Sequence, residues 1–284
     1  ASELIGKDIA DFIHPDYHAA SGEHIRQAQH GASATPFQEQ IWVRLDGSEF
    51  HTEVAATKLV YDGMPTVQTV VRDITVRKRA EELQLGQNRI LNMVATGIEL
   101  VEILNAIALF IESQSEHGLC SILLLDPDGS TLSNGISPSL PDTFRREIDG
   151  LLVAPASGSC GTAIFRAEPV IVTDIAHDPV WATCRNLSLR HGLKACSSWP
   201  IFGKNRKLLG TIALYFREVM APTARDLQLF SVYANLAGIA IESRASEERI
   251  RYLAHYDGLT SLPNRFLFKE FLDLALRNAQ RHGK

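Results

Sequence analysis

The sequence predicts an α+β fold, in which antiparallel sheets are joined by long, coiled-coil-like helices. Near the N-terminus, apolar and polar residues alternate with a period of two around the dipeptides Asp46-Gly47 and Asp62-Gly63, which favour tight hairpin turns. In the middle of the chain, strand-like and helix-like segments alternate and end in a further hairpin. Toward the C-terminus, apolar residues recur every three and four positions, which is the spacing of a coiled coil.

Composition places the chain among ordinary water-soluble proteins with about two domains. The chain has 284 residues, 45% of them hydrophobic and 21% charged, with a formal net charge of −5. The absence of a basic stripe argues against a nucleic-acid partner. The longest apolar stretch, 91–111, is interrupted by Glu99, Glu102 and Asn105, so no membrane span is expected. There is no signal-peptide pattern at the N-terminus, and we expect a cytoplasmic protein.

The four cysteines form no Cys-x-x-Cys pair, and we expect them to be reduced thiols. They are Cys120, Cys160, Cys184 and Cys196.

The first segment, 1–75, combines short helical stretches with three predicted strands. Residues 37–43 alternate in polarity, a strand follows Asp46-Gly47, and another runs from Thr66 to Ile74 after Asp62-Gly63. The stretches ELIGKDIADFIHPDY, RLDGSEF and RDIT resemble the latter part of a PAS domain. That resemblance implies that the first two strands of the PAS sheet are not in this chain, so an exposed apolar edge is expected.

Some PAS domains bind haem through a histidine, which makes the histidines near the N-terminus candidate ligands. In the oxygen-sensing members of the family, the haem ligand corresponds to Ser21 of this chain. His18 and His24 lie on other faces of the same predicted helix, and Pro15 disrupts a regular helix through His14 and His18. We therefore expect solvent-exposed helix histidines, and haem is not supported.

A helical linker is predicted for 76–90, continuing into a dense amphipathic helix that ends near Ser113. Its apolar face repeats at spacings of four and three residues. The positions are Val76, Ala80, Leu83, Gln87, Ile90 and Val94.

The middle domain, 91–242, is predicted to hold an antiparallel sheet layered with helices. Strands are expected at 119–125, 169–172, 193–202 and 208–216, and helices at 141–148 and 179–190. The motifs GSCGTA, EPVIVTDIAHDPVW, RHGLKACSSWPIF and LLGTIALYFR, in this order, resemble a GAF domain of the type found in bacterial sensor kinases and cyclic-di-GMP enzymes.

The GAF resemblance implies a small-molecule pocket but does not name its ligand. The turn at Gly158 and Gly161 could present backbone N–H groups to an anion, but a tight structural turn is the favoured interpretation. The signature of cyclic-nucleotide-binding GAF domains is missing, and Cys184 is followed by Arg185 where bilin-binding members have Cys-His, so a bilin is not supported. The predicted pocket lining is Cys160, Asp174, Trp181, Arg185 and Ser198.

A long helix is predicted from Thr223 to Tyr256. Thr223 and Asp226 form a capping-box pattern at its start. Ser243 and Ser246 occupy two consecutive positions of the apolar rhythm, which makes this turn the weakest part of the seam. We expect the helix to pair in a parallel homodimer, with 243–256 acting as a signalling helix. The predicted dimer seam is Leu229, Val232, Leu236, Ile239, Ile250 and Leu253.

The last segment, 257–284, begins with a turn that ends the long helix. Asp257-Gly258 and Pro263 stop the helix, and Asn264 is suited to cap the next one. The pattern D-x-L-T-x-L-P-N-R resembles the opening of a GGDEF domain, the catalytic unit of diguanylate cyclases. The predicted signalling junction is Asp257, Thr260, Asn264 and Arg265.

The GGDEF signature and its metal-binding carboxylates would lie beyond Lys284, so the resemblance implies no catalytic or metal-binding residues in this chain. The leading interpretation is a cytoplasmic sensory and dimerisation region that regulates a cyclic-di-GMP enzyme, either a diguanylate cyclase or a phosphodiesterase. One alternative is a gas or redox sensor loaded with haem or another cofactor. Another is a GAF-fold thiol enzyme of the methionine sulfoxide reductase kind, which needs paired thiols; the sequence spacing shows no such pair.

Overall fold

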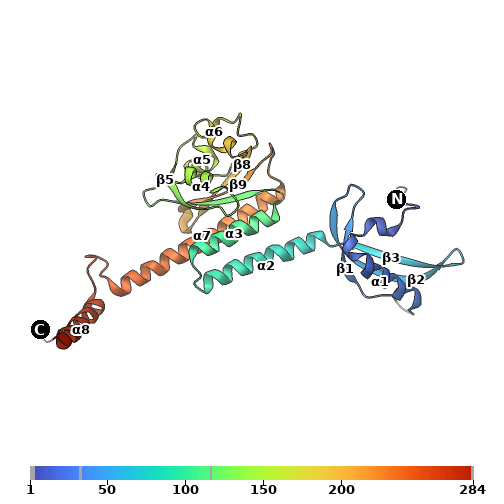
Figure 1. The fold of residues 1–284 in the computed structure, drawn as a ribbon, viewed down its shortest axis with the longest axis horizontal. Helices are drawn as coiled ribbons and strands as arrows, with labels where there is room; N and C mark the ends of the chain where they lie inside the picture. Colours follow the sequence, from blue (N-terminus) through green and yellow to red (C-terminus); the bar gives the residue numbers. More distant parts are fainter. Residues whose placement is uncertain (1–3, 32–33, 116, 283–284) are drawn as a thin grey trace. The chain divides into compact units, whose positions relative to one another are not determined.

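The computed structural model describes residues 4–31, 34–115 and 117–282, and it divides into two compact units, 1–86 and 87–284. Figure 1 follows the chain through both. The first unit contains η1 (Ile9–Phe12), η2 (Pro15–Tyr17), α1 (His18–His30), β1 (Gln38–Val43), β2 (Glu49–Tyr61) and β3 (Met64–Asp73). Its strands pair antiparallel in the order β1-β2-β3. Helix α2 (Thr75–Ala95) begins in this unit and ends in the second.

The hairpin between β2 and β3 forms where the sequence predicts it. Asp62 and Gly63 both have positive φ, at 50° and 76°, and they connect the paired residues Tyr61 and Met64. A two-residue turn of this kind matches the twist of the flanking strands. Within the described residues β3 has β2 as its one strand partner, and Val70 and Val71 are exposed, as expected for an apolar edge.

One predicted feature of the first unit is wrong, namely the exposure of all the helix histidines. His24 is 3% exposed, its Nδ1 lies 2.8 Å from the Gln38 Oε1 atom, and its Nε2 contacts the Thr35 hydroxyl. The reason is that α1 packs on β2 and β3 through one face, and His24 shares that face with Ser21 and Ala28.

The second unit is a sheet with helices on both faces. Its strands are β4 (Leu119–Leu125), β5 (Thr131–Ile136), β6 (Leu151–Leu152), β7 (Val170–Val172), β8 (Ala195–Phe202) and β9 (Leu208–Phe216). They pair antiparallel in the order β6-β5-β4-β9-β8-β7. The helical segments are α3 (Leu100–Gln114), α4 (Asp142–Ile148), α5 (Gly158–Arg166), η3 (Pro179–Trp181), α6 (Arg185–Arg190), η4 (Lys204–Arg206), α7 (Ala224–His255) and α8 (Arg265–His282).

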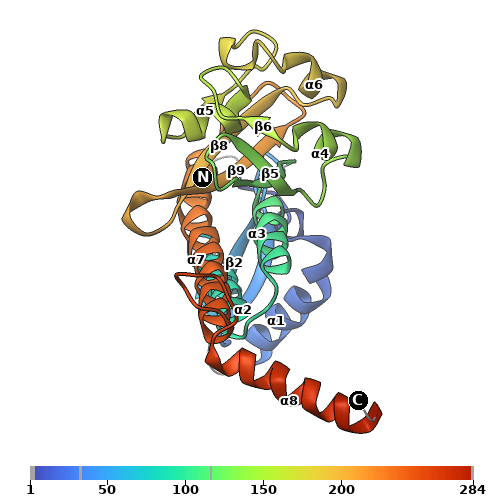
Figure 2. The same cartoon turned by 90° about the vertical axis from the view of Figure 1, so that its left-hand side faces the viewer.

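Figures 1 and 2 show α3 and α7 against one face of this sheet and α4, α5 and α6 over the other. The predicted α+β fold is therefore confirmed. Within the part of the chain that the structure describes, none of the helices combines the length and the apolar character that a membrane crossing requires.

The helix predicted to run without interruption to Ser113 is instead divided in two. Helix α2 ends at Ala95 and α3 begins at Leu100. Gly97 adopts a φ of 70°, which is the left-handed conformation that a glycine takes without steric cost. The Thr96 hydroxyl donates to the Asn92 carbonyl oxygen over 2.8 Å and so satisfies an acceptor at the end of α2.

Helix α7 begins as predicted. The Thr223 hydroxyl accepts from the Asp226 N–H, and the Asp226 carboxylate accepts from the Thr223 N–H, which completes a capping box. The helix then packs on β8, where the Trp199 and Phe230 rings stack with their centroids 4.0 Å apart. A side chain at Gly238 would overlap the Phe202 carbonyl oxygen, so the helix and strand backbones approach closely there.

The predicted dimer seam is wrong for Leu229 and Leu236. These side chains are 4% and 7% exposed within a single chain, because the first half of α7 covers the sheet and α3. They therefore belong to the core of the second unit. Val232 is half-buried, whereas Ile239, Ile250 and Leu253 are exposed.

Candidate functional sites

A cluster of buried thiols and hydroxyls lies between α5 and the sheet of the second unit. The Cys160 Sγ atom, in the first turn of α5, is 3.2 Å from the Ser198 Oγ atom of β8 and 3.5 Å from the Tyr215 hydroxyl of β9. The Cys196 Sγ atom is 3.8 Å from the same Ser198 Oγ atom. All four side chains are buried. The cluster therefore brings two thiols to one shared hydroxyl.

The environment makes the two thiols electrostatically different. Hydrogen bonds from the Cys196 thiol, and then from the Ser198 and Tyr215 hydroxyls, lower the pKa of Cys160 to about 6 against the opposing effect of burial. Burial raises the pKa of Cys196 and of Tyr215 well above their ordinary values. Of the two thiols, Cys160 is therefore the one whose thiolate form its neighbours favour, whereas burial favours the neutral form of Cys196.

A cavity of about 20 Å³ borders Cys160, which is room for about one water-sized molecule. Trp181 and Cys184 form one of its walls, beside Gly158. A Cβ atom on Gly158 would lie 3.2 Å from the Cys184 Sγ atom, and the Gly158 φ of 64° also favours glycine. The close approach of Cys184 and the positive φ therefore both favour glycine at position 158, as expected for a tight structural turn.

Three of the five predicted lining residues come together at this place. Trp181 borders the cavity and donates its indole N–H to the Ser159 hydroxyl over 2.9 Å, while Ser198 contacts the sulfur of Cys160, which also borders the cavity. The Ser159 hydroxyl in turn donates to the Cys196 carbonyl oxygen over 3.3 Å. Cys160, Trp181 and Ser198 are therefore parts of one connected site.

Asp174 and Arg185 do not line this cavity. The Asp174 carboxylate lies 2.6 Å from the Nδ1 atom of the exposed His177, an interaction that lowers the pKa of Asp174. The Arg185 guanidinium donates to the carbonyl oxygens of Ile175 and Asp178, each over 3.2 Å. Both side chains brace the connection between β7 and α6.

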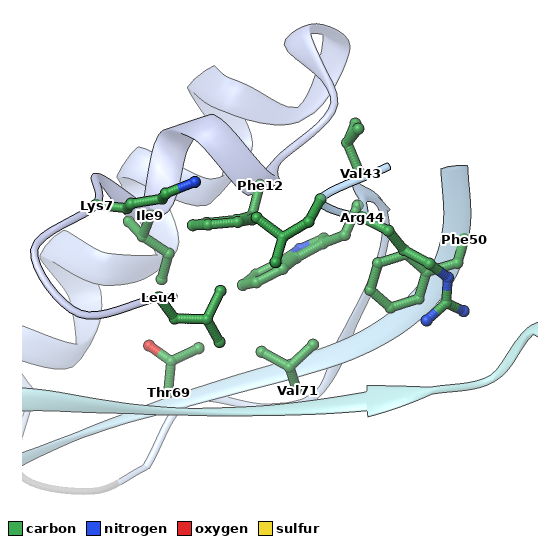
Figure 3. Close-up of a pocket in the computed structure, with 11 residues that line it drawn as sticks. Leu4, Lys7, Ile9, Phe12, Val43, Arg44, Phe50, Thr69 and Val71 are labelled. Carbon is green, nitrogen blue, oxygen red and sulfur yellow. The ribbon is translucent and has the colours of Figure 1, made fainter. Parts of the chain in front are cut away.

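A second cavity, of about 470 Å³, lies in the first unit between η1 and the sheet (Figure 3). Its lining is mostly apolar, and this volume falls in the usual range of small-molecule sites. Lys7 and Arg44 are the cations that line it. The Arg44 guanidinium is already bound to the Asp73 carboxylate over 2.6 Å and lies over the Phe50 ring. The apolar lining residues are Leu4, Ile9, Phe12, Trp42, Val43, Leu45, Phe50 and Val71.

The predicted signalling junction is a hydrogen-bonded turn between α7 and α8. The Asp257 carboxylate accepts from the Thr260 N–H over 2.9 Å and from the Thr260 hydroxyl over 2.8 Å. These hydrogen bonds, that from the Thr260 N–H first, lower the pKa of Asp257. Arg265 is exposed and begins α8.

Asn264 joins the two helices directly. Its Oδ1 atom accepts from the N–H groups of Phe266 and Leu267 at the start of α8, over 3.0 and 3.1 Å. Its Nδ2 atom donates to the Ala254 carbonyl oxygen near the end of α7, over 2.8 Å. One side chain thus caps both helices.

Comparison with known proteins assigns the second unit to a family. Residues 99–242, about half of the chain, match the model of the GAF domain. The chain belongs to the GAF-domain family. The cavity beside Cys160 is therefore a feature of its GAF domain. Residues 1–74 match the PAS fold, so the apolar cavity of Figure 3 lies in a PAS domain.

Two curated relatives are similar to parts of this chain. The methyl sulfide methyltransferase-associated sensor of Methanosarcina acetivorans is 39% identical over 191 residues, which is 65% of this chain and 19% of that protein. Sporulation kinase A of Bacillus subtilis is 32% identical over 98 residues, which is 34% of this chain and 16% of that protein. The chain therefore spans less than a fifth of the length of either relative.

Among solved structures, the GAF domain of a phosphoenolpyruvate-protein phosphotransferase from Coxiella burnetii is similar over 60% of this chain and 98% of that chain. The sequence identity is 17% and the TM-score is 0.46.

Proposed function

We propose that this chain is the sensory and dimerisation region of a cyclic-di-GMP enzyme. The observation that carries the proposal is that α7 runs without a break from the GAF core to the D-x-L-T-x-L-P-N-R turn. We propose the domain limits 1–75 for PAS, 76–90 for the linker, 91–242 for GAF, 243–256 for the signalling helix and 257–284 for the start of a GGDEF domain.

The hydrogen bonds at the junction support a mechanical role for this turn. Because Asn264 binds the end of α7 and the start of α8 together, a rotation or shift of α7 passes to α8. A change in the GAF domain would reach the output through α7, which packs on β8 inside that domain.

The experiment is to express the complete natural gene that encodes residues 1–284 and to assay cyclic-di-GMP. We expect the reading frame to continue into a Gly-Gly-Asp/Glu-Glu-Phe segment, and the product to form cyclic-di-GMP from GTP and Mg²⁺ or to hydrolyse it. Residues 1–284 alone should form none, because the resemblance places the groups that would organise the metal ions and phosphates beyond Lys284. Continuation into a kinase catalytic domain, by analogy with the name of the Bacillus relative, would contradict the proposed output.

We further propose that the chain forms a parallel homodimer through the second half of α7. Ile250 and Leu253 are 68% and 46% exposed, one turn apart, beyond the part of the helix that the GAF core covers. The chain should therefore have twice its 31.4-kDa mass in light scattering at micromolar concentration.

Substituting both residues, Ile250→Glu with Leu253→Glu, should raise the dimer dissociation constant by roughly 100-fold or more, because each apolar side chain contributes about 1.5–3 kcal/mol when buried. Arg251→Glu, on another face of the same helix, is the matched control and should leave the mass unchanged. A wild-type chain that stays monomeric at high concentration would rule the dimer out.

A further inference from the structure

We propose that Cys160 and Cys196 form a reversible disulfide when the GAF domain meets a small peroxide, so that this pair is an oxidant-sensing site. The inference deepens the sensory half of the proposed function, but it does not depend on a cyclic-di-GMP output. It rests on the contacts of the two thiols, on the cavity beside them and on the position of β8.

The contacts hold the two sulfurs in one place. Cys196 and Ser198 are two residues apart on β8 and therefore share a face of the sheet, and Cys160 of α5 lies over that face. Both sulfurs contact the Ser198 hydroxyl, at 3.2 and 3.8 Å. Cys160 and Cys196 are 36 residues apart in the sequence, and they come together because α5 packs on β8.

The two thiols have the different characters that the chemistry requires. The Cys160 sulfur lies within hydrogen-bond distance of the Ser198 and Tyr215 hydroxyls, and these groups together with Cys196 favour its thiolate, the form of cysteine that attacks an oxidant. Cys196 keeps its proton, because burial raises its pKa. Cys160 is thus the attacking thiol and Cys196 the resolving thiol. Burial also raises the pKa of Cys120 and of Cys184, so neither has the character of an attacking thiol.

The cavity beside Cys160 selects the oxidant by size. Its volume of about 20 Å³ admits a water-sized molecule, and hydrogen peroxide is only slightly larger than water. A methionine sulfoxide molecule is several times too large for this space. The geometry therefore points to a small hydroperoxide rather than to the substrate of a sulfoxide reductase.

The proposed reaction balances. The Cys160 thiolate attacks one peroxide oxygen, the O–O bond breaks, and hydroxide leaves and takes up a proton to become water. Cys160 is now a sulfenic acid. The Cys196 sulfur then attacks the Cys160 sulfur, and the sulfenic hydroxyl leaves with the Cys196 proton as a second water. Two thiols have lost two electrons, and one peroxide has gained them. A dithiol reductant reverses the step.

The position of β8 gives the disulfide a route to the output helix. Cys196 and Ser198 face α5, whereas Trp199 faces the opposite side and stacks on Phe230 of α7. A covalent bond between α5 and β8 would thus be made on the strand that carries α7. The oxidation state of the two cysteines would thereby affect how α7 packs on β8.

The test uses the 284-residue chain, freed of reductant and exposed to hydrogen peroxide. Free thiols are then blocked under denaturing conditions and the chain is digested with trypsin, which places Cys160, Cys184 and Cys196 on the separate peptides 147–166, 167–185 and 195–204. We expect the first and third peptides to be joined in about tenfold or greater excess over the untreated chain, and to separate again with dithiothreitol. Methionine sulfoxide in place of peroxide should produce no link.

Variants assign the roles. Cys196→Ser should abolish the link and leave a sulfenic acid on Cys160 that dimedone traps, whereas Cys160→Ser should abolish both. Cys184→Ser is the matched control, because Cys184 lines the same cavity, and it should keep the link. A link from Cys160 to Cys184, an equal yield with methionine sulfoxide, or a Cys160 that stays reduced in excess peroxide would overturn the proposal. These outcomes are read on the wild-type chain, so they stand even if a serine variant fails to fold.

Discussion

Replacing Phe230 with alanine should lower the free energy of unfolding of the GAF domain by about 3–5 kcal/mol, which is the usual cost of truncating a buried aromatic side chain. Phe230 is fully buried, and its ring stacks on the Trp199 ring at an interplanar angle of 5°. The substitution removes both this contact and the apolar burial, and it leaves a cavity between α7 and β8. Because a domain has roughly 5–15 kcal/mol of stability in total, this is a large fraction.

Urea denaturation of the 284-residue chain, followed by circular dichroism, would measure this loss as a lower midpoint for the GAF transition with a similar slope. Leu227→Ala is the matched control: it lies one turn earlier on the same helix, and its side chain is 39% exposed. It should change the free energy of unfolding by about 0.5 kcal/mol or less. Equal losses in the two variants would mean that α7 is not anchored to the sheet through Phe230.

Much of the fold could be predicted from the sequence, because apolar runs and turn residues are local signals. The strand expected at 119–125 is β4 (Leu119–Leu125), since six of its seven residues are apolar. Strands β5 and β6 were not predicted. Strand β5 has the sequence TLSNGI, whose serine, asparagine and glycine do not favour strands, and it forms because β4 pairs with it.

Helix α7 illustrates what periodicity leaves undetermined. An apolar stripe indicates that one face is covered, but it does not say by what. Leu229 and Leu236 are covered by their own domain, whereas Ile250 and Leu253, in the same rhythm, are exposed. The change occurs because the sheet and α3 cover only the first half of the helix, a limit that is set by the tertiary structure.

Only part of the candidate site could be predicted from the sequence, because motifs indicate which residues matter but not which of them meet in the fold. Motif resemblance indicated Cys160, Trp181 and Ser198, which meet through hydrogen bonds of Ser159 and of the thiols. The pairing of Cys160 with Cys196 depends on α5 packing on β8, and sequence spacing carries no information on that contact. Asp174 and Arg185 lie in the same motifs, but their side chains bind His177 and backbone carbonyls outside the cavity.

The part of α7 beyond the GAF core can be shortened to test whether the rotational phase of the helix carries the signal. Arg244 of α7 forms a 2.9 Å ion pair with Glu99, which precedes α3. Residues 245–251 are all exposed, so they can be removed without loss of core packing. The helix in this segment is therefore open to changes in length and phase.

Deleting residues 245–251 from the complete natural protein should preserve regulated activity, because Leu253 then takes the seam position of Ser246 and replaces the apolar contact of the deleted Ile250. Deleting Ser246 and Glu247 should lock the activity on or off. Seven residues are about two helical turns, so the first deletion shortens α7 by about 10 Å but rotates α8 by only about 20°. Two residues correspond to a rotation of about 200° at about 100° per residue, which presents the opposite face of the helix to its partner. Formation of cyclic-di-GMP, the proposed output, would be measured for both variants with and without hydrogen peroxide, the proposed stimulus. Ser243 and Ser246 place hydroxyls in the apolar rhythm here, so two registers can differ little in free energy, as a switch requires. If both deletions kept the same activity and the same regulation, this part of α7 would be a passive tether, and register would carry no signal.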